Sequence, residues 1–318
     1  MKSNTTTTTL YVIVALAFSF ALAGCNPPSK SRVTPAMMLS RMDTDGDGKI
    51  SRSEFTGRKR PFTSFDANAD GAITRQELRT ALGADLDPVT RGAFLVGKGD
   101  LRAQEKRGVL ETGLESDFPK NVDCPTIDHV FGEDWRGPEA GFKHYGADIP
   151  VLPGTPMLAI ADGTVVAKYT GEVGYRGFEI IVRHAPEDTG LPLWIYTQYS
   201  HFAHMPSLKI GQRVRMGEKL GPTGRSGIPG TNREDHLHLG VYFSKSEKYV
   251  AFQHQLIPVA GHYMDPLALM RGKMPVDSHS MAALPKPEKQ VRIPYKLTTG
   301  AIVPPGTKII WPYACNPK

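Results

Sequence analysis

The pattern of hydrophobic and polar positions is most informative in the second half of the chain. Short apolar stretches alternate there with glycine-containing turns, which is typical of a sheet built from short strands. The stretches predict strands at residues 157–160, 163–169, 178–184, 193–199 and 236–243. Asp162-Gly163 is a turn signal of the hairpin type. We therefore expect an antiparallel β-domain over residues 128–271.

The last of these strands begins with His236-Leu237-His238. Side chains two residues apart in a strand face the same side, so both imidazoles point one way. Leu237, Leu239 and Val241 then point the other way, into a core. A metal is held better by side chains on a rigid strand than on a loop. This histidine pair therefore indicates a metal site.

Two further segments carry histidines beside strand-like runs. One holds His144 and Asp148, and the other holds His201. Segments separated by strands can converge on one cleft, and zinc fits such a set of imidazole nitrogens and a carboxylate. A catalytic zinc ion also leaves one position for water. Copper and nickel accept imidazole too, so the ligand types alone do not exclude them.

The first half of the chain contains two tandem stretches that fit the template of a calcium-binding loop. Each has an oxygen-bearing side chain at every side-chain ligand position and a glycine at the sixth position. The seventh position needs only a backbone carbonyl, so lysine and alanine are acceptable there. We predict two calcium sites. Their ligands come from Asp43, Asp45, Asp47, Lys49, Ser51 and Glu54, and from Asp66, Asn68, Asp70, Ala72, Thr74 and Glu77.

These loops resemble a pair of EF-hands over residues 34–84. The resemblance implies that Ile50 and Ile73 pair across the two loops as a short sheet. The loops start closer together than in calmodulin-type hands, so the helices between them must be short. Such spacing also occurs in dockerin modules, which bind a protein partner, whereas the glutamates at the twelfth positions favour an EF-hand. We expect calcium to stabilise this fold.

The N-terminus reads as an export signal. Residues 10–24 are apolar or small and too few to span a bilayer as a permanent helix. The stretch ends in Leu-Ala-Gly-Cys, which resembles the lipobox of bacterial lipoproteins and implies a signal peptide over residues 1–25 with lipidation of Cys25. An ordinary cleaved signal with an unrelated cysteine is the alternative. Residues 26–33 then form a tether. We expect the protein to be lipid-anchored to a membrane of the bacterial cell envelope, facing the periplasm or the outside.

The composition indicates the state of the cysteines and the charge of the protein surface. The chain has 318 residues, three cysteines and a formal net charge of +6. It has no basic stripe with interleaved aromatic residues, so we expect no nucleic-acid partner and a basic surface that faces anionic envelope polymers. If Cys25 is lipidated, Cys124 and Cys315 remain, and an even number outside the cytoplasm favours a disulfide. This disulfide would join two segments of the chain. One is a connector over residues 85–127, which we expect to be helical near residues 100–107, and the other is a Pro/Lys-rich tail over residues 272–318.

The second half of the chain resembles a known family. The motifs HYGAD, PGTPMLAIADGTVV, YSHF, KIGQRVRMGEKLGPTG and HLHLG occur in the order found in lysostaphin and LytM-type zinc endopeptidases, which cut peptide bridges in bacterial cell walls. The resemblance covers residues 129–268. It implies that His144, Asp148 and His238 bind zinc, and that His201 and His236 handle protons and the developing oxyanion. Residues 228–235 are longer than the link usual in the family, which leaves substrate preference open.

The sequence thus predicts a multidomain α and all-β protein, with a small helical EF-hand pair before an antiparallel β-sheet zinc peptidase domain. We expect a zinc endopeptidase that hydrolyses cross-link peptides of peptidoglycan and also holds two structural calcium ions. Arg225 or Arg233 is a candidate for reading substrate carboxylates. The alternatives are a catalytically silent scaffold that binds wall peptides or activates another hydrolase, a closed structural zinc site, and a calcium-dependent docking module that binds a protein partner.

Overall fold

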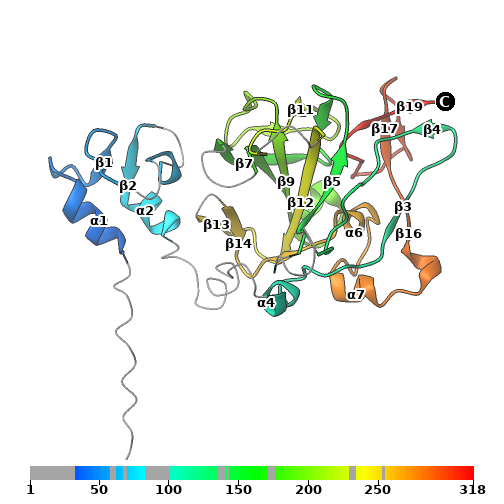
Figure 1. Cartoon of the computed structure of the whole chain (residues 1–318), viewed down its shortest axis with the longest axis horizontal. Coiled ribbons are helices and arrows are strands. Elements are labelled where there is room, and N and C mark those ends of the chain that lie inside the picture. Colours follow the sequence, from blue (N-terminus) through cyan, green and yellow to red (C-terminus); the bar gives the residue numbers. More distant parts are fainter. Residues whose placement is uncertain are drawn as a thin grey trace, which may run out of the picture. The chain divides into compact units, whose positions relative to one another are not determined.

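A computed structural model describes most of the chain (Figure 1). The described residues are 33–57, 62–66, 70–82, 101–134, 141, 143–170, 176–228, 234–252 and 255–318. The expected lipidation site Cys25, most of the tether, the calcium ligand Asn68 and Arg233 lie outside them. In the described part of the chain, none of the helices has the length and hydrophobicity needed to cross a bilayer.

The N-terminal part contains a pair of helix-loop units. Its elements are α1 (Pro35–Met42), β1 (Lys49–Ser51), the 3-10 helix η1 (Phe62–Ser64), β2 (Ala72–Thr74) and α2 (Arg75–Ala81). Thr34 caps α1, because its side chain accepts a hydrogen bond from the backbone N–H of Met37. Strands β1 and β2 pair antiparallel with Ile50 opposite Ile73, and both side chains are fully buried. The predicted contact between the two loops is confirmed.

The C-terminal part is built on a seven-stranded antiparallel sheet. Its order is β10-β7-β8-β9-β12-β15, with β5 also paired to β12. These strands are β5 (Gly146–Pro150), β7 (Gly163–Thr170), β8 (Phe178–His184), β9 (Trp194–Phe202), β10 (Arg213–Val214), β12 (His236–Ser244) and β15 (His262–Tyr263). The predicted antiparallel β-domain is therefore confirmed.

One predicted turn has a different role in the structure. Strand β6 (Pro156–Leu158) pairs with β11 (Lys219–Pro222) in a separate two-stranded sheet, and β7 pairs with β8 and β10. Asp162-Gly163 therefore joins strands of two different sheets, and the expectation of a hairpin there is wrong. Each of the two strands beside this turn pairs with strands from elsewhere in the chain, and that tertiary pairing overrides the local preference.

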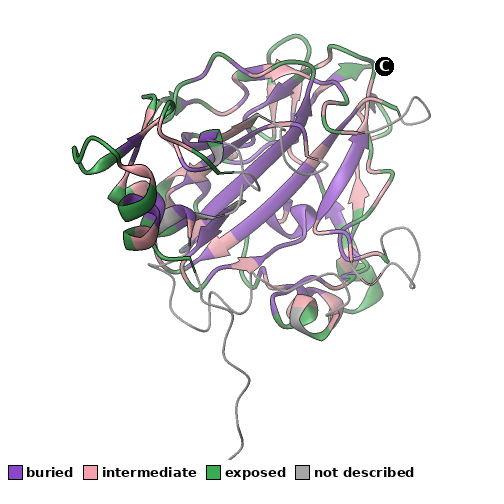
Figure 2. Ribbon diagram, turned by 60° about the vertical axis from the view of Figure 1, so that its left-hand side comes forward, coloured by how far each residue is buried: buried purple, intermediate pink, exposed green. Residues whose placement is uncertain are grey.

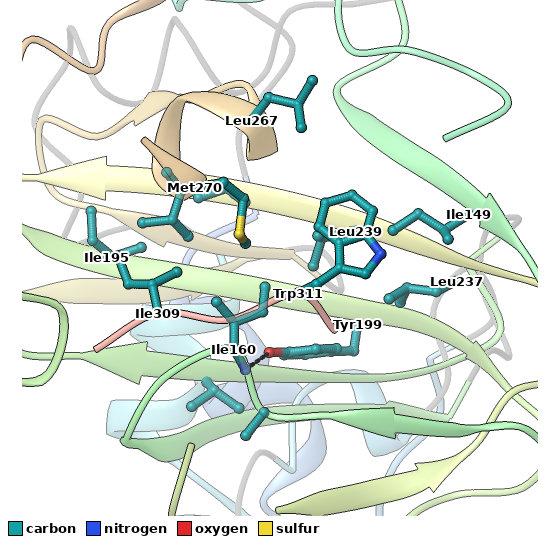
Figure 3. Close-up of a cluster of buried hydrophobic side chains, with 14 of the residues drawn as sticks. Ile149, Ile160, Ile195, Tyr199, Leu237, Leu239, Leu267, Met270, Ile309 and Trp311 are labelled. Carbon is teal, nitrogen blue, oxygen red and sulfur yellow. Dashed lines mark hydrogen bonds between the residues drawn. The ribbon is translucent and has the colours of Figure 1, made fainter. Parts of the chain in front are cut away.

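The two faces of the central sheet carry different kinds of side chain. Leu237, Leu239 and Val241 on β12 are fully buried on one face, where they join the main hydrophobic core. Figure 2 shows the long strands of the sheet mostly in the colour of buried residues, and Figure 3 shows Leu237 and Leu239 in this core. His236 and His238 lie on the opposite face, as their alternation in the strand predicts. The apolar side chains therefore fix the strand, and the strand fixes the direction of the two imidazoles.

Further elements surround the sheet. They are α4 (Leu101–Lys106), β3 (Glu115–Asp117), β4 (Val122–Asp123), α5 (Pro186–Thr189), β13 (Tyr249–Phe252), β14 (Gln255–Pro258), α6 (Pro266–Met270), α7 (Ser278–Ala282), the 3-10 helix η3 (Lys286–Lys289), β16 (Gln290–Arg292), β17 (Tyr295–Leu297), β18 (Ile302–Val303) and β19 (Ala314–Pro317). Helix α4 lies where the sequence predicts one. Two pairings are parallel, β16 with β3 and β17 with β19.

The segment after residue 272 is part of the main core. Trp311 is fully buried, packs with Leu237 and Leu239, and donates its indole N–H to the Pro125 carbonyl at 2.8 Å (Figure 3). Next to it, the Ile310 N–H donates to the Ile160 carbonyl at 2.8 Å. These residues therefore complete the core beneath the sheet.

Cys124 and Cys315 form a disulfide in the structure, 191 residues apart in the sequence. Replacing both by serine is expected to lower the free energy of unfolding by roughly 2–5 kcal/mol, because the open chain has more conformational entropy when unfolded. Urea unfolding of the wild type and the double variant, followed by tryptophan fluorescence, measures the difference. Wild type in reducing buffer is the control and should match the variant. Equal midpoints for all three samples would contradict the prediction.

Candidate active site

Three of the predicted metal ligands meet where β5 and β12 pair. Asp148 lies directly opposite His238 in this pair, and His144 lies just before β5. The Asp148 Oδ1 atom lies 2.8 Å from Nδ1 of His238 and 3.1 Å from Nε2 of His144. The two ring nitrogens are 3.1 Å apart. One donor atom from each residue therefore converges on one point, and the three atoms lie within 4.8 Å of one another.

The hydrogen bonds of His144 prepare it to bind a metal. Its Nδ1 atom lies 3.0 Å from the Val130 carbonyl, and a carbonyl oxygen can only accept, so Nδ1 carries the proton. The neutral ring then keeps a lone pair on Nε2, the atom that faces Asp148 and His238. Two imidazole nitrogens and one carboxylate oxygen are a donor set that suits zinc and leaves a fourth position open. The residues present therefore fit the ion.

Burial controls the protonation of this cluster. Asp148 is 3% exposed, and burial acts to raise the pKa of its carboxyl, but the neighbouring imidazoles of His144 and His238 outweigh burial and hold that pKa far below its usual value. Burial lowers the pKa of His238 to about 4. At neutral pH the site therefore has an ionised carboxylate and a neutral His238 ring with a lone pair for a metal.

Gly146 leaves the space that the His238 ring occupies. A Cβ atom at residue 146 would lie 2.7 Å from Cε1 and Nε2 of His238 and 2.6 Å from the Leu239 carbonyl oxygen. Gly146→Ala is therefore expected to push β5 away from β12 and to weaken zinc binding by roughly 10- to 100-fold, as a change next to a ligand does. Competition with a fluorescent zinc chelator measures the affinity.

Gly154→Ala is the control for that variant. Residue 154 has a positive φ like many turn glycines, but no atom lies within 4 Å of the added methyl group. We expect it to strain the backbone slightly and to leave zinc affinity unchanged. Equal zinc affinities for wild type, Gly146→Ala and Gly154→Ala would show that the ring does not need this space.

The two histidines expected to handle protons also lie at this site. The rings of His201 and His236 are 4.8 Å apart between centroids, and His201 is 6.2 Å from His238. Nδ1 of His201 donates to the Ser226 carbonyl at 2.8 Å, and Nδ1 of His236 donates to the Glu234 carbonyl at 3.0 Å. In the neutral tautomer that fits these two bonds, each ring keeps the lone pair of its Nε2 atom.

The surroundings keep His201 uncharged. Burial, together with the neighbouring imidazoles of His236 and His238, lowers the pKa of His201 to about 3. The residue ends the regular part of β9 in the left-handed region, with φ of 67°, and its carbonyl accepts from the Gly224 N–H at 2.8 Å. This backbone turn, which is uncommon outside glycine, directs the ring toward the metal-binding residues.

A buried polar network on the same sheet face was not anticipated from the sequence. Oε2 of Glu179 accepts from Nε2 of Gln198 at 2.6 Å and from Oγ of Ser200 at 2.8 Å, and Gln198 accepts from the Tyr242 hydroxyl. Ser200 is the register partner of His238. Polar residues at alternate positions of an otherwise apolar strand, here 198 and 200, are the signal that could have revealed it.

The first calcium loop brings its acidic residues together. The carboxylates of Asp43, Asp45 and Asp47 form a group whose oxygens lie within 4.8 Å. Glu54, at the twelfth position, folds back over the loop and accepts hydrogen bonds from Ser51 and Thr44, which lower the pKa of its carboxyl to about 2. The loop therefore presents ionised oxygens suited to a hard divalent cation.

The second loop repeats parts of this arrangement. Asp66 accepts from the N–H groups of Asp70 and Gly71, and Glu77 accepts from the N–H and hydroxyl of Thr74. Lys49 and Ala72 begin the paired strands β1 and β2, where only their backbone carbonyls would be needed. The described members of the second loop thus occupy the same relative places as those of the first.

Comparisons with known proteins agree with this division of the chain. Residues 142–251 match the family described as peptidase family M23, and residues 37–56 and 60–82 match the EF hand. An uncharacterized metalloprotease of Haemophilus influenzae is 33% identical over 114 residues, which are 35% of this chain and 22% of that protein. The glycyl-glycine endopeptidase ALE-1 of Staphylococcus capitis is 32% identical over 99 residues, which are 31% of this chain and 24% of that protein. The chain thus spans about a quarter or less of these relatives.

The chain also has a likeness to a solved structure. The catalytic domain of the antimicrobial peptidase lysostaphin from Staphylococcus simulans is 24% identical, with a TM-score of 0.30. The match covers 39% of this chain and 84% of that domain.

Proposed function

Because residues 142–251 of this chain form a domain of peptidase family M23, we propose that the protein is a zinc-dependent metalloendopeptidase that hydrolyses peptide cross-links of bacterial peptidoglycan. The observation that carries the proposal is the convergence of His144, Asp148 and His238 beside the imidazoles of His201 and His236. A structural zinc site needs four closed ligands, whereas this set offers three ligands and adjacent bases. The relative from Staphylococcus capitis is named a glycyl-glycine endopeptidase, which supports an amide within a peptide as the bond that is cleaved.

The proposed mechanism divides the work among five side chains. Zinc held by His144, Asp148 and His238 would act as a Lewis acid and make water more acidic. The lone pairs on Nε2 of His201 and His236 can accept a proton from the attacking water at neutral pH. A ring that has gained this proton becomes a donor, so it can stabilise the developing oxyanion or return the proton to the leaving amine.

The test uses a soluble form that begins at residue 26. We expect one zinc ion per chain by elemental analysis and conversion of purified cross-linked peptidoglycan into uncross-linked fragments, detected by chromatography and mass spectrometry. Removal of zinc by a chelator should stop the reaction, and added zinc should restore it. Binding to peptidoglycan of several types without any cleavage would instead support the silent scaffold.

We further propose that the two loops at residues 43–54 and 66–77 bind calcium and stabilise the N-terminal part. Calorimetric titration is expected to give two ions per chain with dissociation constants of about 10⁻⁴–10⁻³ M, the range of extracellular modules. Glu54→Gln should weaken the first site by roughly tenfold or more, because it removes a charged ligand. Ser53→Ala, next to it but at no ligand position, is the control. Two unchanged sites in Glu54→Gln would contradict the assignment.

We also propose that the protein is anchored through a lipidated Cys25 to a membrane of the cell envelope. A peptidoglycan substrate, as proposed above, supports a location in the cell envelope. The lipobox-like sequence before Cys25 supports the lipid anchor. Mass spectrometry of the N-terminal peptide from membranes tests it, because an acylated cysteine adds a defined mass. An unmodified peptide would remove the anchor from the proposal and leave the catalytic part unchanged. A protein partner of the EF-hand part remains a second proposal, tested by calcium-dependent binding of residues 34–84.

A further inference from the structure

The candidate metal ligand His144 lies outside the strand pairing that fixes the other two ligands. The pairing of β5 with β12 starts at Gly146 and includes Asp148 opposite His238. His144 precedes this pairing, so the register of the sheet alone does not fix its place. Its Nε2 atom nevertheless lies 3.1 Å from Oδ1 of Asp148. Other contacts must therefore hold the segment that carries His144.

A segment from before the family-matched region runs beside His144. The family match begins at residue 142. The His144 N–H donates to the Glu133 carbonyl at 2.9 Å, and the His144 carbonyl accepts from the Gly132 N–H at 2.7 Å. Asp134 and Lys143 form an isolated antiparallel bridge next to these bonds. The backbone of this ligand is thus held by residues that lie before the matched region.

Gln104 of α4 holds the residues just before His144 through its side-chain amide. Its Oε1 atom accepts from the Lys143 N–H at 2.8 Å, and its Nε2 atom donates to the Gly141 carbonyl at 3.3 Å. A backbone N–H can only donate and a carbonyl can only accept, so this orientation of the amide is the one that satisfies both. One side chain thus bonds to the backbone as a neighbouring strand would.

The end of α4 is itself fixed to the central sheet. The backbone carbonyl of Gln104 accepts from the Arg107 N–H at 3.0 Å. The Arg107 side chain is buried and donates to the Gly261 carbonyl at 2.5 Å, and the Arg107 carbonyl accepts from the Tyr263 N–H at 2.8 Å. Tyr263 lies on β15, which pairs with β12. Gln104 therefore links the segment before β5 to the sheet that carries the other ligands.

We propose that Gln104 is a positioning residue for the metal site, which holds residues 141–143 so that His144 is in place to bind zinc. This inference rests on the proposed function. A ligand that is already held in place loses less conformational freedom when the ion binds, so the affinity is higher. Groups that orient a metal ligand commonly contribute roughly 10- to 100-fold to metal affinity. Helix α4 of the connector then supports the metal site as well as joining two parts of the chain.

The experiment measures the zinc affinity of the full-length protein by competition with a fluorescent chelator. Gln104→Ala removes both hydrogen bonds and is expected to lower the affinity by roughly 10- to 100-fold. Gln104→Glu keeps an acceptor for the Lys143 N–H, but a carboxylate cannot donate to the Gly141 carbonyl. An intermediate loss is expected for this variant, and it decides the question if Gln104→Ala does not fold. Glu105→Ala, at an exposed position of the same helix, is the control and should match wild type.

The rate of peptidoglycan hydrolysis gives a second readout. Gln104→Ala should need a higher zinc concentration for its half-maximal rate, by the same factor as its loss of affinity. A role in stability alone would lower the urea midpoint of the metal-free protein and leave the zinc affinity unchanged, which would overturn the assignment. An equal loss of affinity in Glu105→Ala would also overturn it. Wild type that binds zinc without hydrolysis would overturn the proposed function alone, whereas wild type that binds no zinc would overturn both.

Discussion

Replacing His238 by alanine is expected to remove the zinc ion and to slow hydrolysis of cross-linked peptidoglycan by about 10³-fold or more. The residue supplies one of the three converging donor atoms found in the described part of the chain, and its Nδ1 lies 2.8 Å from Asp148. Lewis-acid stabilisation of a transition state is worth several kcal/mol, and each 1.36 kcal/mol is a tenfold change in rate. Elemental analysis and initial rates of fragment release measure both effects.

His204→Ala is the matched control for this variant. His204 is exposed, lies just after β9 and is not among the residues of the site. It should retain one zinc ion and the wild-type rate, so that any general effect of losing an imidazole is accounted for. Zinc bound to His238→Ala with full affinity would show that another residue completes the donor set and that His238 is not a ligand.

Replacing His201 by asparagine is expected to lower kcat by roughly 10²- to 10⁴-fold while zinc content stays at one per chain. This range is the usual contribution of a positioned acid or base. Asparagine tolerates the left-handed backbone of this position, so the variant removes the proton-transferring ring with little added strain. The two variants thus separate metal binding from proton transfer.

The measurement for His201→Asn combines zinc analysis with steady-state kinetics on a purified peptide dimer. A change in kcat with little change in KM is expected, because the ring acts on charge that develops during the reaction. His204→Ala again serves as the control. If kcat is unchanged, His236 alone handles the proton, and if zinc is lost, His201 supports the ligands instead.

Much of the site could be predicted because it follows local rules. Two histidines separated by one residue in a strand must share a face, and the fully buried leucines between and after them fix which face that is. The calcium loops are similarly local, since every ligand lies within twelve residues. Sequence spacing alone decides such arrangements, and the structure brings His144, Asp148 and His238 together as the family resemblance implies.

The parts that could not be predicted depend on distant contacts. Strand β8 is apolar at most positions, so the pattern does not tell which face Glu179 takes. Its role as a hydrogen-bond acceptor depends on the pairing of β8 with β9, which brings Gln198 and Ser200 next to it. Likewise, no periodicity in the sequence indicates that Trp311 packs beneath β12, because its neighbours in the core lie far away in the chain.

The place of Trp311 in the core has a consequence for the timing of biosynthesis. A ribosome makes all five histidine and aspartate residues of the site well before it reaches Trp311 and Cys315. Until those late residues arrive, Leu237 and Leu239 lack part of the surface that buries them. The domain that carries the site therefore cannot complete this core until residues 311–315 have been synthesised. The order of synthesis thus sets when the strands that carry these side chains can be fixed in place.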